Sequence, residues 1–288
     1  MNKKKVGIIA ECTCDLPKST IEKYDIDMLY FLIETESGIF TDTDEITAQN
    51  ILLHMESGGK RSKPYPPAAE VYKKAFEKNL AKYDEVILVS ISSSVSHSVE
   101  QAKKSAALVE NGADRIHIFD TGHLSSGLGF MVMKAAELAN EGRSADKILS
   151  ELELLKKRIS TTFIIRNTNY LYRNGLIKRW LDRLCSLFNV HPILEMKSGK
   201  LIAKTFIIGN YTYAYRKYIR KILRKGYGAD KKKVFIAHAG CSVKMLRTVT
   251  LEVEKQCHFE EVIPVSASAT ISCNCGPETF GVMFLKSE

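Results

Sequence analysis

The sequence lacks any long apolar run and several common enzyme signatures. No stretch approaches the ~18 consecutive apolar residues that a membrane-spanning helix needs, and G-x-x-x-x-G-K-[ST], G-x-S-x-G and a G-x-G-x-x-G after the first strand are all missing. The first residues also lack the apolar segment and cleavage site of a secretory signal. We therefore expect a cytoplasmic protein with no membrane span and with none of these catalytic motifs.

Cysteine is scarce and odd in number. Seven cysteines in 288 residues argue against a disulfide framework and for reduced thiols. Four of them form two Cys-x-Cys pairs, Cys12 with Cys14 and Cys273 with Cys275. Structural zinc sites usually separate their cysteines by about two to four residues, so we expect small buried side chains, no metal and no cofactor. A redox or metal role for these four thiols remains an alternative.

Charge is distributed unevenly along the chain. Residues 1–150 contain 18 Lys and Arg against 22 Asp and Glu, whereas residues 151–288 contain 24 against 11. This asymmetry predicts an anionic partner for the second half. The most basic stretch places cations on one side of a predicted helix, namely Arg216, Arg220 and Arg224 beside Lys217, Lys221 and Lys225. A solvated face and a docking surface are the main interpretations, and nucleic acid is not expected.

The first half alternates short β-rich runs with helical patterns. Strands are expected at residues 6–10, 28–33, 86–91 and 116–120, and helices at residues 19–24, 48–56, 68–80, 96–109 and 125–140. This spacing is typical of βαβ units in a parallel sheet with helices on both faces. Because ligands of such sheets bind beyond the carboxyl ends of the strands, we expect the site in the loops 11–17, 92–98 and 120–129.

The order of expected strands and helices changes after a helix predicted at residues 145–157. Strands are expected at residues 161–166, 192–196, 201–208 and 234–238, helices at residues 211–225 and 242–256, and two strands near the end. A Lys-Ser-Gly-Lys turn at 197–200 indicates a hairpin, so this half predicts an α+β domain with a mixed sheet. We expect an α/β protein of two domains, 1–158 and 159–288, with the ligand in the cleft between them.

Two polar loops of the first half could bind an anion. Residues 92–98 are rich in serine, follow a strand and open a helix, and hydroxyls and free N–H groups at a helix N-terminus suit a carboxylate or phosphate. The serines could equally only cap that helix. The glycines and prolines of residues 58–67 exclude a helix, and this loop carries Arg61, Ser62 and Lys63.

These loops, in this order, resemble the DegV family of bacterial proteins that carry a fatty acid between two domains. The family's T-D-S-T-A-D-L-P, T-S-Q-P-S-P and S-S-x-L-S-G-T-Y-x-S-A are similar to residues 10–17, 61–66 and 92–102. Its D-S with S-x-G-x-G, its Y-L-x-x-G-G-R-I and its N-I-K-P-I-L are similar to residues 120–129, 170–177 and 189–194. The resemblance covers nearly the whole chain, and six motifs in register make it specific.

The resemblance implies a lipid-binding protein without catalytic machinery of its own. In the family, hydroxyls of the two serine/threonine loops and a histidine of a C-terminal H-x-G-P-G hold the carboxylate. The ligand-binding residues implied here are Arg61, Ser62, Ser93, Ser96, Ser98 and Asn274. Some members present the carboxylate to a separate ATP-binding kinase subunit, which would dock here on the basic face that includes Arg216 and Lys225. A divergent binder of another amphiphile or small anion is the alternative.

The chain departs from the family pattern at charged positions. Asn274 stands where the family has its histidine, Leu176 replaces the arginine of G-G-R-I, and His191 replaces the lysine of N-I-K-P. Arg61 replaces a threonine, and His97 replaces a glycine. Because a guanidinium binds a carboxylate bidentately, we expect Arg61 to compensate for the missing histidine.

Overall fold

The computed structural model describes residues 5–43, 45–59, 62–173, 175, 177–226 and 228–287, and it divides into two compact units. The first unit comprises Met1–Leu32, Tyr65–Arg158 and Lys197–Lys200, and the second comprises Ile33–Pro64, Ile159–Met196 and Leu201–Glu288. One division between the units falls after Arg158, and the domain ranges 1–158 and 159–288 stay a prediction. Residues 33–64 belong to the second unit and the turn 197–200 belongs to the first, so each unit contains segments that are far apart in the chain.

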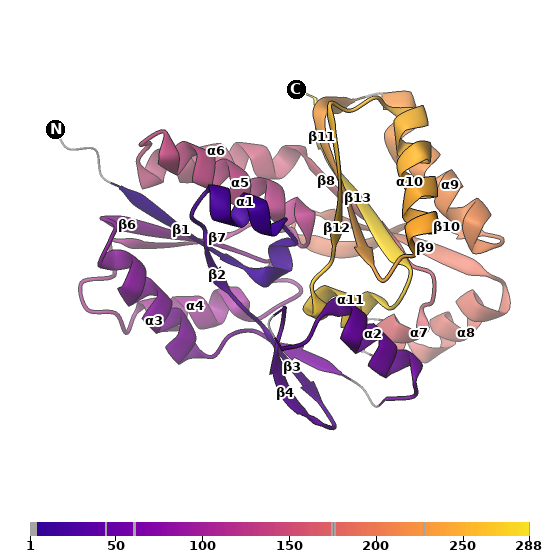
Figure 1. Cartoon of the computed structure of the whole chain (residues 1–288), viewed down its shortest axis with the longest axis horizontal. Helices are drawn as coiled ribbons and strands as arrows, with labels where there is room; N and C mark the ends of the chain where they lie inside the picture. Colours follow the sequence, from indigo (N-terminus) through magenta and orange to yellow (C-terminus); the bar gives the residue numbers. More distant parts are fainter. Residues whose placement is uncertain are drawn as a thin grey trace. The chain divides into compact units, whose positions relative to one another are not determined.

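A parallel sheet forms the centre of the first unit, in the strand order β2-β1-β6-β7 (Figure 1). Its strands are β1 (Val6–Glu11), β2 (Asp27–Leu29), β6 (Glu85–Ser90) and β7 (Ile116–Asp120). All three strand pairs are parallel. The inner strands β1 and β6 are buried along nearly their whole length, as their runs of Val, Ile and Leu predict.

Helices cover both faces of this sheet, as expected. They are α1 (Lys18–Lys23), α3 (Ala69–Leu80), α4 (Ser98–Ala106), α5 (Ser126–Asn140) and α6 (Ala145–Arg158), with a 3-10 turn at Cys12–Cys14. Helices α3 and α4 pack on each other, and α5 packs on α6, on β1 and on that turn. The fully buried Tyr72 and Phe76 of α3 fill the core between α3 and the sheet.

The single strand predicted at residues 28–33 is two strands. Strand β2 ends at Leu29, and β3 (Leu32–Thr35) joins a separate three-stranded sheet with β4 (Gly38–Thr41) and β5 (Lys63–Tyr65), in the order β4-β3-β5. Helix α2 (Ala48–Glu56) follows β4 and begins with a capping box between Thr47 and Asn50. The apolar run through residues 28–33 hides the point where the chain leaves one sheet for another.

A mixed sheet forms the centre of the second unit and confirms the expected α+β class. Its strands are β8 (Ile159–Ile164), β9 (Val190–Lys197), β10 (Lys200–Ile208), β11 (Ala229–Ala239), β12 (Glu261–Ser266) and β13 (Thr279–Lys286), in the order β10-β9-β8-β13-β11-β12. In this sheet β11 and β12 are parallel, whereas β13 pairs antiparallel with both β11 and β8, and β8 pairs antiparallel with β9. The hairpin turn at Ser198 and Gly199 has positive φ at both residues, as a two-residue turn requires.

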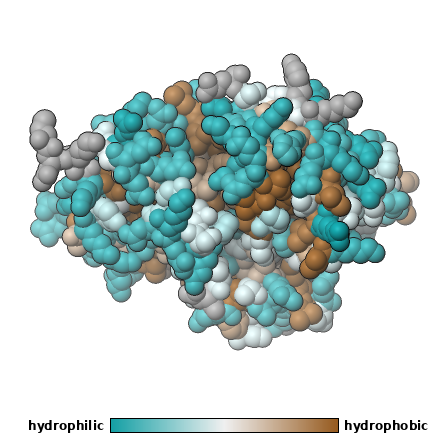
Figure 2. Space-filling model, turned by 45° about the horizontal axis from the view of Figure 1, so that its top comes forward, coloured by the Kyte–Doolittle hydropathy of each residue, from teal (hydrophilic) through white to brown (hydrophobic). Residues whose placement is uncertain are grey.

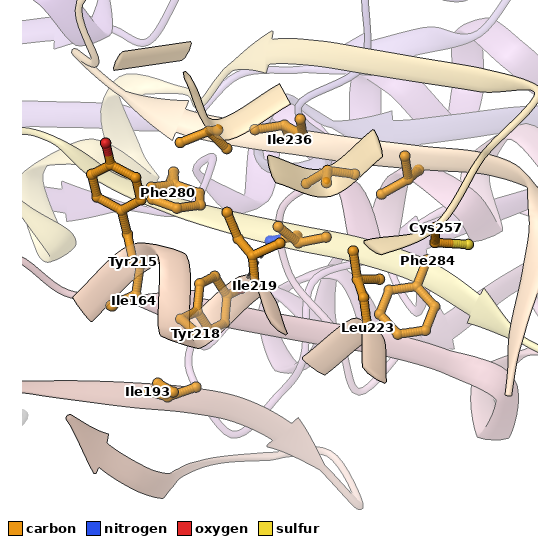
Figure 3. Packing of buried hydrophobic residues seen from close by; sticks show 14 of the residues in the cluster. Ile164, Ile193, Tyr215, Tyr218, Ile219, Leu223, Ile236, Cys257, Phe280 and Phe284 are labelled. Atoms are coloured by element: carbon orange, nitrogen blue, oxygen red, sulfur yellow. Dashed lines mark hydrogen bonds between the residues drawn. The ribbon is translucent and has the colours of Figure 1, made fainter. Parts of the chain in front are cut away.

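The second unit's helices are α7 (Asn169–Arg173), α8 (Arg179–Leu187), α9 (Tyr211–Leu223), α10 (Val243–Gln256) and α11 (Ala269–Cys275). Figure 3 shows Tyr218 and Ile219 of α9 packed over Phe280 of the sheet. The buried Tyr218 hydroxyl contacts the Thr162 hydroxyl at 2.9 Å and accepts the N–H of Val282 at 3.1 Å. The polar end of this ring is therefore satisfied inside an apolar core.

Helix α9 is shorter than predicted, and α11 was not predicted. Arg224 has φ 43° and caps α9 in the left-handed region, so it leaves the helical ridge of Arg216 and Arg220. The short α11 has too few residues to show a helical period. None of the helices in the described ranges is both long and apolar enough to cross a bilayer, and hydrophilic residues cover most of the face seen in Figure 2.

Candidate functional site

The three loops predicted to form a site lie at one edge of the parallel sheet of the first unit. They leave the carboxyl ends of β1, β6 and β7, and hydrogen bonds join them. The Ser125 hydroxyl donates to the carboxylate of Asp15 at 2.5 Å, and the Ser93 hydroxyl donates to that of Asp120 at 2.5 Å. Parallel strands bring their carboxyl ends to the same edge, which is why the sequence could predict this grouping.

Glu11, the last residue of β1, is a fully buried acid at this edge. Its carboxylate accepts the Ile91 N–H at 2.9 Å and the hydroxyls of Tyr72 at 2.8 Å, Ser90 at 3.1 Å and Ser98. Desolvation by burial raises the pKa of Glu11, and the hydrogen bonds from these four groups oppose part of that rise. Hydroxyls can donate or accept, so the cluster can satisfy either protonation state.

The Glu11 carboxylate fixes both ends of the serine-rich loop. Ile91 precedes the loop and Ser98 begins α4, and both bind this one side chain. Sequence reasoning matched Glu11 to a family motif but gave it no role. The available signal was an acid that ends an otherwise apolar strand next to the predicted ligand loops.

Serine hydroxyls of the same loop also hold the hairpin turn that belongs to the first unit. Those of Ser92 and Ser94 both donate to the Gly199 carbonyl, at 2.6 and 2.5 Å. Gly122, with φ 63°, lies against this turn, and a Cβ there would be 3.1 Å from the Cα of Gly199. Two of the loop's hydroxyls therefore serve packing within the first unit.

The predicted ligand residues of this loop differ in whether their hydroxyl proton has an acceptor. A hydroxyl has one proton, and Ser93 gives its proton to Asp120, so a ligand carboxylate would compete with Asp120 for it. Ser98 belongs to the Glu11 cluster. The Ser96 oxygen accepts the N–H of Ser98 at 3.2 Å, and no acceptor for the Ser96 proton occurs in the part of the chain that the structure describes.

Ser62 is the predicted ligand residue of the second unit's first segment. It is 2% exposed, and its hydroxyl has no hydrogen-bond partner among the described residues. A buried unsatisfied polar group costs about 1–3 kcal/mol, and a polar ligand atom is one way to remove that cost. Lys63 lies exposed in β5, whereas Arg61, the expected replacement for the missing histidine, lies outside the described residues.

Asn274 lies on α11, half-buried, and its side-chain amide donates to the Thr270 carbonyl at 3.0 Å. The N-terminus of α11 already faces an anion, because the fully buried Asp42 carboxylate accepts the N–H groups of Ala269 and Thr270 at 2.9 and 2.8 Å. The buried hydroxyls of Thr270 and Ser272 have no partner within the described ranges. Sequence reasoning named neither hydroxyl, because it did not predict α11.

The two Cys-x-Cys pairs lie in different units, and their thiols are mostly buried. Burial raises the pKa of Cys14 to about 12 and also raises the pKa of Cys273. Thiols with raised pKa values are poor nucleophiles at neutral pH, which speaks against the redox alternative. No group of three or more His, Cys, Asp or Glu side chains in the described part of the chain could hold a metal ion.

A family model described as an uncharacterised protein of the DegV family matches residues 5–287. The chain belongs to the DegV family. A DegV domain-containing protein from Caldanaerobacter subterraneus is 25% identical to this DegV protein over 285 residues, 98% of this chain and 99% of the relative.

Solved DegV structures have the same fold. One described as fatty acid binding of a DegV family protein from Thermus thermophilus has a TM-score of 0.86 and 26% identity, over 98% of this chain and 100% of that one. A DegV lipid-binding protein from Thermotoga maritima gives a TM-score of 0.84 at 23% identity, over 99% of each chain. A DegV protein from Eubacterium eligens, loaded with heptadecanoic acid, gives 0.83 at 15%, over 98% of this chain and 100% of that one. The last two likenesses are of fold alone.

The predicted basic face of this DegV protein is partly neutralised within the second unit. Arg220 Nε donates to the buried carboxylate of Glu252 at 2.8 Å, which offsets this one charge, whereas the 3.0 Å hydrogen bond from Lys221 Nζ to the neutral Thr205 hydroxyl leaves the lysine charge in place. Arg216 is exposed on the same helix. The cationic surface of α9 is therefore smaller than the sequence suggested.

Proposed function

We propose that this DegV protein binds a long-chain fatty acid. The observation that carries the proposal is a full-length match, at a TM-score of 0.86, to a DegV protein described by its fatty acid binding. Burying each CH₂ group contributes ~0.8 kcal/mol, so a sixteen-carbon chain offers about 12 kcal/mol before ordering costs. The acyl chain therefore supplies most of the affinity, and the head-group contacts supply orientation.

We assign the carboxylate to hydroxyls whose protons have no internal acceptor among the described residues. Ser96 and Ser62 meet this condition, and a hydroxyl–carboxylate hydrogen bond is charge-assisted. Ser93 meets this condition only if its hydroxyl turns away from the Asp120 carboxylate, to which it now donates. This ordering makes Ser62 and Ser96 more important for affinity than Ser93, while Arg61 and Asn274 remain predicted contacts.

The direct test is mass spectrometry of an organic extract from the purified, unheated protein. We expect one fatty acid per chain, of roughly 14–18 carbons given the energy per CH₂. Ser62→Ala and Ser96→Ala should each weaken palmitate binding by about tenfold. Ser150→Ala, at an exposed position of α6, is the matched control and should bind as the parent does. A lipid-free extract together with no palmitate binding would overturn the proposal and favour another amphiphile.

We further propose that the bound carboxylate is presented to a separate ATP-binding kinase subunit. The carboxylate oxygen would attack the γ-phosphorus of ATP, forming the acyl phosphate and releasing ADP, with no catalytic group from this chain. Arg216 on the exposed side of α9 is the candidate docking cation.

The assay measures acyl phosphate formation from labelled ATP. It contains the palmitate-loaded protein and a purified ATP-binding fatty acid kinase subunit. Arg216→Glu should slow acyl phosphate formation and leave palmitate affinity unchanged. If Arg216→Glu supports the same rate as the parent at limiting concentrations, the docking surface lies elsewhere.

A further inference from the structure

The second unit contains a pocket of ≈ 410 Å³, and none of the predicted ligand residues that the structure describes lines it. It lies where β8 ends, β9 begins and α9 starts, and its walls include Arg166, Asn167, His191, Asn210 and Tyr211. This volume is within the range of about 300–1,000 Å³ found for small-molecule sites. Among the described residues, none of those that line it is acidic.

Two asparagines that line this pocket have side-chain NH₂ groups as potential donors. Asn210 caps α9, and its side-chain oxygen accepts the Tyr213 N–H at 2.9 Å. The side-chain oxygen of Asn167 accepts the Asn169 N–H at 2.9 Å. With each amide oxygen engaged, the two NH₂ groups are the parts of these side chains that still carry unassigned hydrogens.

Arg166 adds a positive charge that is held in place. Its guanidinium forms an ion pair with Glu278 and lies 5.8 Å from the centroid of the Tyr211 ring. The Tyr211 hydroxyl in turn donates to the Glu278 carbonyl at 2.6 Å. A guanidinium has five N–H donors, more than one carboxylate can accept in a bidentate pair, so donors remain for a ligand.

The backbone around the pocket also favours a negatively charged ligand. The N-terminus of the thirteen-residue α9 opens here, and a helix N-terminus carries partial positive charge. His191 is buried, with Nδ1 3.1 Å from the Arg166 carbonyl and Nε2 3.2 Å from the Gly209 carbonyl. Its ring therefore lies between the segment at Arg166 and the segment just before Asn210.

We propose that this pocket binds a phosphate group, either inorganic phosphate or a small phosphate monoester. The donor residues come from two chain segments, the adjacent Arg166 and Asn167 and, 44 residues beyond Arg166, Asn210, and three donors match the three free oxygens of a phosphate better than the two oxygens of a carboxylate. The volume leaves room for a small organic group beside Tyr211. The site involves none of the residues assigned to the fatty acid, so its test is independent of the fatty-acid proposal.

Two isosteric substitutions isolate the proposed donors. Asn210→Asp keeps a side-chain oxygen for the Tyr213 N–H, since Asp and Asn cap helices about equally well, but it replaces the NH₂ donor by a negatively charged oxygen. Asn167→Asp makes the same change and keeps the bond to Asn169. Ser242→Asp is the matched control, because it adds the same charge at the N-cap of α10, and Ser242 does not line the pocket.

The probe is inorganic phosphate, titrated by calorimetry, with thermal unfolding as the check on folding. We expect saturable binding that Asn210→Asp and Asn167→Asp each weaken by at least about tenfold and that Ser242→Asp leaves unchanged. Tighter binding of glycerol phosphate than of phosphate would identify a monoester as the ligand, and equal binding would identify the phosphate group alone. If one variant fails to fold, the other carries the test.

Three results would overturn the proposal. The first is no saturable phosphate binding by the parent protein. The second is an equal loss of affinity in Ser242→Asp, which would mean that only general charge matters. The third is acetate binding as tight as phosphate, which would exclude selection for a tetrahedral anion.

Discussion

Replacing Glu11 by alanine should destabilise the protein by about 2–4 kcal/mol, the combined cost of one unsatisfied buried N–H and the cavity left by the side chain. The substitution removes the acceptor of the Ile91 N–H at the start of the serine-rich loop, for which the described residues offer no other. The hydroxyls lose less, because Tyr72 and Ser98 already contact each other at 2.7 Å, and Ser90 and Ser98 at 3.2 Å. The main losses are therefore one buried N–H, worth about 1–3 kcal/mol, and the cavity left by the side chain.

Glu11→Gln should cost within about 1 kcal/mol at neutral pH. The amide oxygen can still accept the Ile91 N–H, and the new NH₂ group can donate to a hydroxyl that turns its lone pair toward it. The contrast between the two variants separates the loss of hydrogen bonds from the loss of charge.

The pH dependence of the parent has a definite sign. Because burial raises the pKa of Glu11 in the folded state, the stability from its protonated form is fully present below the unfolded-state pKa of about 4.3. That contribution is lost as pH rises through the raised folded-state pKa. Glutamine does not titrate, so the stability advantage of the parent over Glu11→Gln should shrink as pH rises.

Urea unfolding across a pH series measures the free energy lost in each Glu11 variant and how that loss depends on pH. Glu254→Ala, at an exposed position of α10, is the control and should change stability by no more than about 0.5 kcal/mol. The reasoning fails if Glu11→Ala costs no more than this control. It also fails if the advantage of the parent over Glu11→Gln grows with pH.

Three further predictions concern packing and reactivity. Arg220→Leu leaves the buried Glu252 carboxylate without its cation and should lower the midpoint of urea unfolding, whereas Arg216→Leu on the same helix should leave that midpoint nearly unchanged; equal shifts would contradict the pairing. Gly276→Ala places a Cβ 2.2 Å from the Tyr170 ring at a φ of 76° and should lower stability by about 1–3 kcal/mol, while an unchanged thermal midpoint would refute that crowding. The thiols of Cys14 and Cys273 should resist alkylation at pH 8 until urea unfolds the chain, because burial raises the pKa of both; rapid labelling of either one in the native protein would favour the redox alternative.

Local patterns predicted the parts of this fold that local chemistry decides. The parallel strands of the first unit, the serine-rich loop at the end of β6 and the hairpin turn at Ser198 and Gly199 all follow from periodicity and turn residues. The end of α9 was predicted too late, because the left-handed conformation of Arg224 has no marker such as glycine. The seven-residue α11 escaped prediction for lack of a repeating period.

Contacts between distant segments decided the rest of the candidate site. The sequence placed Ser93 among the ligand residues, but only the folded chain shows that Asp120, 27 residues away, accepts its proton. The same holds for Glu11, whose hydrogen-bond partners lie 61 to 87 residues further along the chain.

The sequence by itself determined the family, the α/β class of the first half, the α+β class of the second half and the edge of the sheet where polar loops gather, because strand periodicity and short motifs are local properties. Only the tertiary structure decided which hydroxyl protons have acceptors, that residues 33–64 join the second unit, and that Arg166, Asn167 and Asn210 line one pocket. These properties depend on burial and on hydrogen bonds between segments far apart in the chain. The hydrogen-bond partner of a side chain depends on which distant segment packs against it, and the residues next to it in the sequence do not predict that packing.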